Sequence, residues 1–324
     1  MSFRLERRLG SAELAAQLRR EAREGLTSIP KQLRSRWIWD ARGSALYERI
    51  MELPDYYLPG AERALLEDHA DDIAAAARPR TVVELGSGSS AKTRSLLDAL
   101  PQLERFVAVD VSESALAQAG PRLAARYPHV EIVGIVADYE RELPSLSAGT
   151  LLAVLGSTIG ALEPADRAAL LASIAAALPA DGALLLGLDL VKRVERIVAA
   201  YDDAEGLSAE LIANPLRILN RELGADFVPE RFRSEASWSP ELERMEMAVR
   251  SLERQTVALP AIDLVVELGE GETLRTEIST KFRRDGARRE LEVAGLAVAS
   301  WWAGEDGDFA LCLARPVPER WDAA

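Results

Sequence analysis

The stretch TVVELGSGSSAKT, from Thr81 to Thr93, joins a short apolar strand pattern to a loop of glycines and serines. Gly86, Gly88 and Ala91 fit the pattern G-x-G-x-x-[G/A] between a predicted strand and a predicted helix. Glycines at these positions allow a tight turn and let a ligand approach backbone N–H groups at a helix N-terminus. Asp110 follows at the distance where an acidic residue hydrogen-bonds ribose hydroxyls. Together these features predict a nucleoside-cofactor site, and the alternative is a purely structural glycine turn.

Strand-like and helix-like segments alternate around this loop. Short apolar strands separated by helices of 10–15 residues are typical of βαβ units and of a parallel sheet covered on both faces. The predicted fold class is therefore α/β, with a doubly wound, Rossmann-like sheet. The strand-like runs are 81–85, 105–111, 130–138, 151–157 and 183–191, and the helix-like runs between them are 91–100, 113–127 and 164–178.

The pattern changes on both sides of this alternation. An amphipathic helix is predicted over 11–27, with Ser11 as its N-cap, and another over 62–77. After Val191 a long helical region is followed by strand-like pieces, which indicates a smaller α+β domain. The chain then ends in a helix-like run and an antiparallel hairpin with a Gly/Asp turn. The helical region is 192–223, the strand-like pieces are 255–260, 261–268 and 272–282, the last helix-like run is 288–300, and the hairpin is 301–316.

Composition narrows the class of partner. The formal net charge of -13 disfavours nucleic acid and anionic membrane surfaces, so a small-molecule substrate is expected. The only cysteine, Cys312, allows no internal disulfide. The two histidines, His69 and His129, lie far apart, so no His/Cys-rich metal site is expected, and an all-carboxylate site stays open from the residues alone. The charged N-terminal segment lacks the apolar core of a signal peptide. We expect a cytoplasmic protein, and a monomer.

Two acidic positions select among nucleoside cofactors. Glu84 lies two residues before the first glycine, where a carboxylate would repel a pyrophosphate but would suit the cationic groups of S-adenosylmethionine (SAM). Asp138 and Tyr139 end the third strand, where methyltransferases place an acid and an aromatic ring beside the adenine. The alternatives are a solvated strand end for Glu84 and a turn cap for Asp138.

Over nearly its whole length the chain resembles the ergothioneine-pathway histidine Nα-methyltransferases, which use SAM to trimethylate histidine to hercynine. The family fold implies a SAM-binding domain over 61–191 and 282–324, and a substrate-binding domain over 1–60 and 192–281. The resemblance is carried by GLTSIPKQL, WDARGSALYERIMELPDYY, VELGSGSSAKTRSLLDAL, LGSTIGAL, GLDLVKRVERIVAAYDDAEG, NRELGADF, TEISTKF and WWAGEDGDFAL.

The resemblance also implies the site residues. Glu277 and Ser279 of TEISTKF match the pair that grips the imidazole ring, and a strand places residues i and i+2 on one face. Tyr201 would orient the amino-acid end of the substrate, and Tyr56 would close the pocket. Trp39 stands where the family has a tyrosine near the cofactor. The cofactor-binding set is Trp39, Glu84, Gly86, Gly88, Lys92, Asp110, Asp138, Tyr139 and Ser157, and the substrate-binding set is Tyr56, Ala161, Tyr201, Glu277 and Ser279.

Two departures from the family fall on the substrate side. Ala161 replaces the asparagine that helps to hold the substrate backbone, and LPGAE follows Tyr57 where the family has a proline and Thr-Arg-Thr-Glu. Losing a hydrogen bond to a charged group costs about 1.5–3 kcal/mol. These changes fit either a histidine enzyme that compensates elsewhere, or a relative that methylates another amino acid or small amine.

Methyl transfer from a sulfonium is an in-line displacement that depends on proximity and orientation. No catalytic acid, base or nucleophile is therefore assigned. Two other classes stay open from the residues alone. One is a nicotinamide-dependent oxidoreductase, against which Glu84 and the terminal hairpin count. The other is a non-catalytic binder, against which the retention of Tyr201, Glu277 and Ser279 counts.

Overall fold

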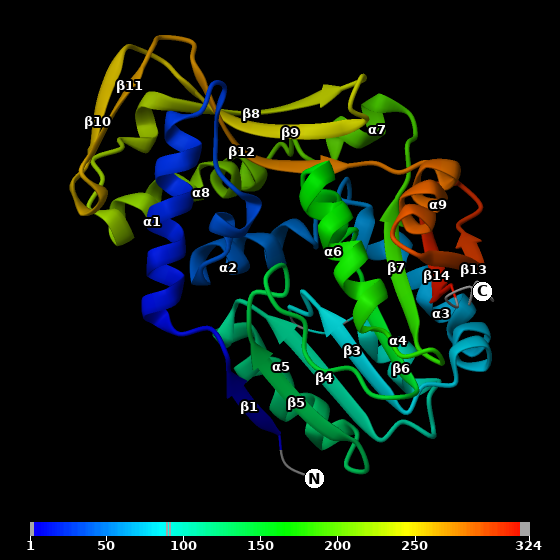
Figure 1. Ribbon diagram of the computed structural model, residues 1–324. Helices are drawn as coiled ribbons and strands as arrows, with labels where there is room; N and C mark the ends of the chain where they lie inside the picture. The colour runs from blue at the N-terminus through cyan, green and yellow to red at the C-terminus, as the bar shows by residue number, and fades with distance from the viewer. Residues whose placement is uncertain (1–2, 89, 91, 318–324) are drawn as a thin grey trace, which may run out of the picture. The chain divides into compact units, whose positions relative to one another are not determined.

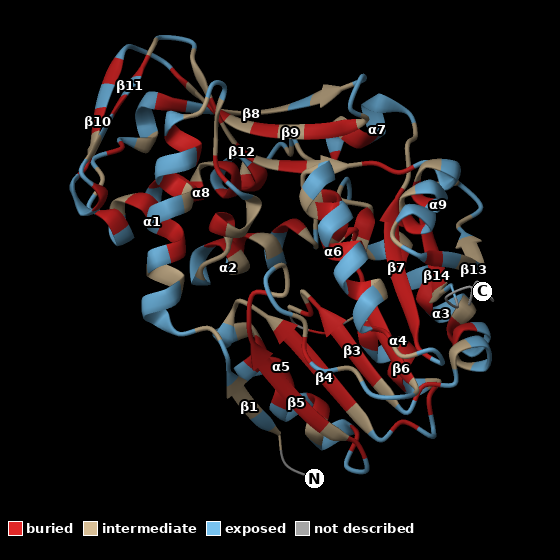
Figure 2. Cartoon of the chain, in the orientation of Figure 1, coloured by how far each residue is buried: buried red, intermediate tan, exposed pale blue. Residues whose placement is uncertain are grey.

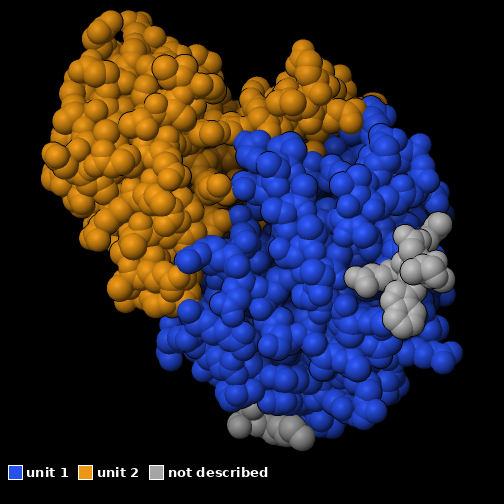
Figure 3. Space-filling model, viewed as in Figure 1, with its two compact units in different colours: residues 1–8, 58–191, 281–324 blue, residues 9–57, 192–280 orange. Residues whose placement is uncertain are grey.

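The computed structural model describes residues 3–88, 90 and 92–317, so Ala91, the third position of the glycine pattern, lies outside the described residues (Figure 1). The chain forms two compact units, coloured separately in Figure 3. Unit 1 takes its described residues from 3–8, 58–191 and 281–317, and unit 2 consists of 9–57 and 192–280.

Unit 1 is built on an eight-stranded sheet in the order β1-β5-β4-β3-β6-β7-β14-β13. Six strands from β1 to β7 run parallel, and β14 and β13 close the sheet as an antiparallel hairpin. The predicted doubly wound sheet and its terminal hairpin are therefore confirmed. The strands are β1 (Arg4–Arg7), β3 (Thr81–Leu85), β4 (Arg105–Asp110), β5 (Glu131–Val136), β6 (Thr150–Val154), β7 (Ala183–Asp189), β13 (Leu296–Ala303) and β14 (Phe309–Pro316).

Helices cover both faces of this sheet. Apolar residues of α3 (Leu58–Ala77), α4 (Thr93–Asp98) and α5 (Glu113–Arg126) pack on one face. Those of α6 (Pro164–Ala177) and α9 (Arg284–Val293) pack on the other. The central strands are consequently buried along most of their length, as Figure 2 shows, which explains their continuous apolar sequence.

The strand order reverses beside β3. The chain runs outward from β3 through β4 to β5 and then returns to β6 on the other side of β3. In open α/β sheets, ligands bind outside the carboxyl ends of the strands at such a switch point. The glycine loop leaves β3 at that end, so the topology places the predicted cofactor loop where a ligand site is expected.

Two expectations at the ends of the chain were wrong. The first residues were assigned to the substrate-binding domain, but Arg4–Arg7 pair in parallel with β5 and so belong to the sheet of unit 1. The last helix was expected over 288–300, but it ends at Val293, and β13 begins at Leu296 after Gly295. Gly295 has a φ of +86°, a left-handed conformation that glycine adopts without strain and that stops a helix.

Unit 2 contains a four-stranded sheet in the order β2-β12-β9-β8 and a separate β10–β11 hairpin. Apolar residues of α1 and α8 share its core with residues of these strands. Its elements are α1 (Ser11–Thr27), β2 (Lys31–Gln32), η1 (Ser35–Ile38), α2 (Ala41–Ile50), α7 (Val194–Ala199), α8 (Leu207–Leu223), η3 (Pro229–Arg231), β8 (Phe232–Ser239), β9 (Arg244–Ser251), β10 (Gln255–Leu259), η4 (Pro260–Ile262), β11 (Leu264–Leu268) and β12 (Thr273–Thr280).

Three details of unit 2 differ from the expectation. Helix α1 begins at Ser11, but its N-cap residue is Gly10. The predicted helical region 192–223 is two helices separated by a turn that ends at Gly206 (φ +73°). Strands β8 and β9 were not predicted.

No helix in the described part of the chain has the length and apolar character that crossing a bilayer requires.

A buried ion pair marks the place where the chain leaves and re-enters unit 1. The Lys281 Nζ lies 2.7 Å from Asp189 Oδ2, and both side chains are fully buried. Around this pair the backbone N–H of Phe282 donates to the Asp189 carbonyl (2.8 Å), and that of Val191 donates to the Phe282 carbonyl (3.0 Å). The segment at 189–191, where the chain leaves unit 1, and the segment at 281–282, where it returns, are thus joined by both backbone and side-chain contacts.

Candidate active site

The glycine loop is held by its own backbone and by Asp110. Gly86 (φ +67°) and Gly88 (φ +50°) both adopt the left-handed conformation that favours glycine. The Gly86 N–H donates to the Val109 carbonyl, and the Gly88 N–H donates to Asp110 Oδ2 at 2.9 Å. Asp110 Oδ1 accepts from the Ser112 N–H at 2.8 Å. Because a carboxylate offers about four acceptor sites, Asp110 retains capacity for ribose hydroxyls.

Two serines of the loop carry buried hydroxyl groups. Ser87 and Ser90 are 7% and 3% exposed, and neither Oγ finds a hydrogen-bond partner among the described residues. Burying an unpaired hydroxyl costs about 1–3 kcal/mol, so such groups in a loop indicate a missing polar ligand. The loop therefore fits a polar cofactor. In the sequence, Ser87 lies between the two glycines and Ser90 lies between Gly88 and the helix. Sequence alone did not distinguish these serines from ordinary turn residues.

Glu84 is buried beneath the loop. The Thr93 hydroxyl donates to its Oε2 at 2.6 Å. The pKa of Glu84 is raised to about 7, mainly by burial and to a smaller extent by Glu62 and Asp110, against the lowering effects of the Thr93 hydrogen bond and the Lys92 ammonium. The alternative of a solvated strand end is wrong, because Glu84 is 2% exposed. Such a carboxylate gains from a cation placed beside it.

We predict that ionisation of Glu84 destabilises the protein without cofactor. The unfolded chain loses this proton near its ordinary pKa of 4.5, whereas the folded protein retains it up to about 7. Stability should therefore fall as the pH rises between these values, by at most about 3 kcal/mol. Thermal unfolding from pH 5 to pH 8 measures this, and Glu84→Gln should gain stability relative to the wild type across that interval.

A matched control is Glu67→Gln, which makes the same change at an exposed position of α3. Its stability should follow that of the wild type at every pH. If the stability of Glu84→Gln and that of the wild type change in parallel with pH, the prediction is contradicted.

Asp138, Tyr139 and Ser157 lie on the loops that follow β5 and β6. Asp138 Oδ1 accepts from the Glu140 N–H at 3.1 Å, so this residue does cap a turn, which does not preclude a cofactor contact. The Tyr139 hydroxyl lies 3.6 Å from where a Cβ on Gly86 would stand, which places it over the glycine loop. Ser157 is left-handed (φ +56°), and its Oγ accepts from the Asp189 N–H at 3.1 Å.

The predicted substrate residues of unit 2 come together on one face of its sheet. The Tyr201 hydroxyl lies 2.8 Å from Ser279 Oγ. The register of β12 shifts between Arg275 and Glu277, so that Glu277 faces Met247 and Ser279 faces Met245 across β9. Directly opposed residues share a face. Glu277 and Ser279 thus share the face of the apolar residues that α8 covers.

The register shift at Thr276 is what turns this pair inward. Leu274, before the shift, pairs with Val249 on the same face. In a regular strand, residues three apart point to opposite faces, so Leu274 and Glu277 could not both point toward α8. A bulge redirects side chains in this way, and bulges concentrate beside functional sites. The spacing of Glu277 and Ser279 was predicted from the sequence, but the bulge was not.

A row of aromatic rings leads to Tyr201. Successive rings of Trp39, Tyr47, Tyr56 and Tyr201 meet edge to face, with centroids 5.2, 6.0 and 6.1 Å apart. Burial raises the pKa of Tyr56 well above its ordinary value, and Tyr47, Tyr201 and Glu277 add to this, so its hydroxyl stays protonated. Tyr47 was missed, although it lies in one of the motifs that carry the family resemblance.

The remaining predicted residues divide between the units. Trp39 belongs to unit 2 with the aromatic row, whereas the other predicted cofactor residues belong to unit 1. Ala161 ends the short helix η2 (Thr158–Ala161) in unit 1 and is half-buried. The other predicted substrate residues belong to unit 2.

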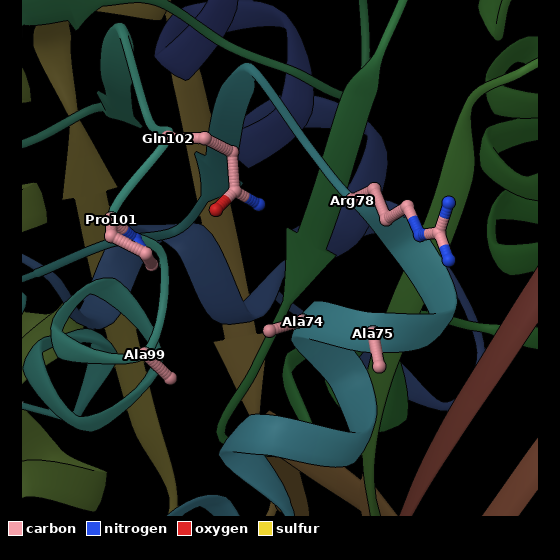
Figure 4. Close-up of a pocket in the computed structure, with 6 residues that line it drawn as sticks. All are labelled: Ala74, Ala75, Arg78, Ala99, Pro101 and Gln102. Atoms are coloured by element: carbon pink, nitrogen blue, oxygen red, sulfur yellow. The ribbon is translucent and has the colours of Figure 1, made fainter.

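A shallow pocket of about 430 Å³ lies elsewhere on unit 1 (Figure 4). It is formed by the end of α3 and the segment that joins α4 to β4. Arg78 lies just before the amino end of β3, whereas the glycine loop follows the carboxyl end of the same strand. The pocket is therefore at the opposite end of β3 from the glycine loop and is not part of the candidate site. Its lining residues are Ala74, Ala75, Arg78, Ala99, Pro101 and Gln102.

The sequence over most of the chain matches a known family. The family model described as "Histidine-specific methyltransferase, SAM-dependent" matches residues 18–316. The chain belongs to this family. SAM is therefore the cofactor, and membership of this methyltransferase family favours an enzyme over both the oxidoreductase and the binder alternatives.

Named members of the family are similar over nearly the full length. The histidine N-alpha-methyltransferase of Mycolicibacterium smegmatis is 43% identical over 97% of this chain and 99% of its own. That of Mycobacterium tuberculosis is 43% identical over 92% of this chain and 94% of its own. A 4-dimethylallyltryptophan N-methyltransferase of Trichophyton verrucosum is 27% identical over 92% of this chain and 93% of its own. The chain is thus similar to relatives that are named for different amines.

Proposed function

We propose that this methyltransferase acts on the α-amino group of free histidine and produces Nα-trimethylhistidine, as a step of ergothioneine biosynthesis. The observation that carries the proposal is the group formed by Glu277, Ser279 and Tyr201 beside Tyr56 in unit 2. Full-length similarity to two histidine N-alpha-methyltransferases supports it.

The residues of this group suit an imidazole ring. Glu277 offers a carboxylate acceptor and Ser279 a hydroxyl, which together match the two nitrogens of the ring as donor and acceptor. The Tyr201 and Ser279 hydroxyls share one hydrogen bond in which either can donate, so the other hydroxyl of this pair keeps its proton for the substrate. Tyr56 also keeps its proton. The substrate is thereby oriented without any group that exchanges a proton with it.

We assign the cofactor to the loops at the carboxyl ends of β3, β4, β5 and β6. SAM supplies, when bound, a methyl carbon activated by the adjacent sulfonium. Gly86 and Gly88 form the tight turn that lets the cofactor approach the loop backbone closely, while their own N–H groups are bonded within unit 1. Asp110 accepts hydrogen bonds from the ribose hydroxyls, and Asp138 and Tyr139 border the base. Glu84 provides negative charge, and Lys92 and Ser157 complete the set. The chain's own contribution is alignment, which is the main source of rate in such a displacement.

The test is a product assay. The protein is incubated with SAM and a panel of free amino acids, and products are identified by mass spectrometry. We expect histidine to gain up to three methyl groups. Methylation of another amine with none on histidine would overturn the assignment of substrate, and a silent panel would overturn free amino acids as the substrate class.

A second candidate substrate, another amino acid or small amine, is favoured by one observation. Ala161 ends η2 at the position of the family asparagine and offers no side-chain hydrogen bond. Similarity over 92% of this chain to a methyltransferase named for a substituted tryptophan also supports this candidate.

We predict that Ala161→Asn improves histidine as a substrate. Restoring a hydrogen bond to the charged end of the amino acid is worth about 1.5–3 kcal/mol, so the KM for histidine should fall at least about tenfold, with kcat little changed. Steady-state kinetics with varied histidine measures this effect. Ala161→Val is the control, since it adds bulk without a donor and should not lower KM. An unchanged KM for the asparagine variant would favour the second candidate.

A further inference from the structure

Glu62 is a fully buried carboxylate that is not among the predicted site residues. It lies in the first half of α3 and is 0% exposed. A buried charge costs several kcal/mol unless it is paired and hydrogen-bonded. Its Oε2 lies 2.7 Å from Lys92 Nζ, and its Oε1 accepts a hydrogen bond from the backbone N–H of Gly156.

The two partners of Glu62 belong to the two loops that border the switch point. Lys92 stands at the start of α4, at the end of the glycine loop that leaves β3. Gly156 follows β6 and precedes Ser157 and η2. Strands β3 and β6 are neighbours in the sheet. One carboxylate therefore bridges both loops at the point where the sheet topology places the cofactor.

The packing around Glu62 leaves no spare room. A Cβ on Gly156 would lie 2.7 Å from Lys92 Nζ, and one on Gly187 in β7 would lie 2.0 Å from Glu62 Oε1. Both distances are below the contacts that real Cβ atoms make. The glycines thus allow the ammonium and the carboxylate to lie against the backbone of the loop after β6 and of β7.

The charges near Lys92 show what this pairing prevents. Lys92 also interacts with Glu84, whose ionised form it favours, while Glu62 disfavours that form. Two buried carboxylates therefore compete for one ammonium. The side chain of Lys92 is 27% exposed, so it has access to a ligand while Glu62 holds it. Without the charge of Glu62, the ammonium would be free to turn toward Glu84.

We propose that Glu62 is a positioning residue for SAM: it fixes the Lys92 ammonium and the Gly156 backbone, and it does not itself touch the cofactor. The inference depends on the assignment of Lys92 to the cofactor site made above. It does not depend on which amine is methylated, because it concerns the binding of cofactor alone.

The test is calorimetric titration of SAM and of S-adenosylhomocysteine into the wild type, Glu62→Gln, Lys92→Met and the double variant. Lys92 and Gly156 approach different oxygens of Glu62. Glutamine keeps the shape of Glu62 but loses the charge and places an NH2 donor against one of these two partners. We expect Glu62→Gln to weaken both ligands about tenfold. The double variant should bind no more weakly than Lys92→Met alone, because the two residues act as one unit.

Several results would overturn the inference. One is binding of both ligands by Glu62→Gln within twofold of the wild type. Another is an effect of Glu62→Gln that adds fully to that of Lys92→Met, which would mark a merely structural role. If Lys92→Met itself binds like the wild type, the assignment of Lys92 to the cofactor site fails and the inference fails with it. A loss with Lys92→Met but none with Glu62→Gln leaves the site assignment standing and rejects only the inference.

Two further variants separate positioning from folding. Glu67→Gln makes the same change at an exposed position of α3 and should bind SAM like the wild type. Glu62→Asp keeps the buried charge but shortens its reach by one methylene, so it tests the inference if the glutamine variant does not fold. We expect it to melt close to the wild type and to bind SAM more weakly, and wild-type affinity would reject the proposal.

Discussion

Replacing Glu277 with glutamine is expected to lower kcat/KM for histidine by about 100-fold. In the proposed site the carboxylate would accept a charge-assisted hydrogen bond from the imidazole, and such bonds contribute about 1.5–3 kcal/mol. Glutamine retains the volume and one acceptor oxygen but loses the charge. The substitution changes no residue of the predicted cofactor-binding set, so the affinity for SAM should not change. Steady-state kinetics with varied histidine, together with calorimetry of SAM, measures both quantities.

The control for this prediction is Glu267→Gln, which removes a carboxylate from an exposed position of β11 in the same unit. It should leave kcat/KM unchanged. A loss of less than threefold in Glu277→Gln would mean that Glu277 does not hold the ring. An equal loss of affinity for SAM would mean that the substitution disturbs the protein more widely.

The sequence predicted the sheet of unit 1 closely because its strands carry strong local signals. The strand at Thr81–Leu85 was placed correctly at both ends, and the glycine loop after it was recognised from spacing alone. Buried parallel strands read as continuous apolar runs, and the helices between them are long enough to show their period. Local pattern therefore sufficed where every strand is covered on both faces.

Unit 2 was predicted less well because its strands are only partly buried. Strand β8, with the sequence FRSEASWS, has one buried residue and no apolar alternation, so nothing marks it as a strand. In β9 the residues Met245, Met247 and Val249 do alternate, and this signal could have been found. The short β1 is a strand only because β5 offers it a free edge, which is a tertiary effect.

The site shows the same division between local and tertiary information. Motif and resemblance indicated Glu277, Ser279 and Tyr201, which the structure brings together. They could not indicate the bulge at Thr276 that turns Glu277 toward α8. Nor could they indicate Glu62, since its partners lie 30 and 94 residues further along the chain. Pairings of that kind arise only when distant elements pack.

Breaking the Asp189–Lys281 pair should have the largest effect on stability. Lys281→Met leaves a fully buried carboxylate without its counter-ion, and removing one partner of such a pair costs about 3–5 kcal/mol. Replacing both, as in the double variant Asp189→Leu with Lys281→Met, should restore most of this loss, because an apolar pair of similar volume carries no desolvation cost. Urea unfolding of the three variants and the wild type measures these differences.

An exposed ion pair provides the comparison. Arg288 and Glu292 lie one turn apart on α9, with side chains 53% and 52% exposed. Pairs of this kind contribute only about 0.3–0.5 kcal/mol, so Arg288→Met should unfold close to the wild type. A loss below 1 kcal/mol in Lys281→Met would contradict the prediction. If the double variant is as unstable as Lys281→Met, the loss of stability comes from disturbed packing and not from an unpaired buried charge. Because Lys281 follows directly on the strand that carries Glu277 and Ser279, the same variants also show how firmly the end of that strand must be anchored in unit 1.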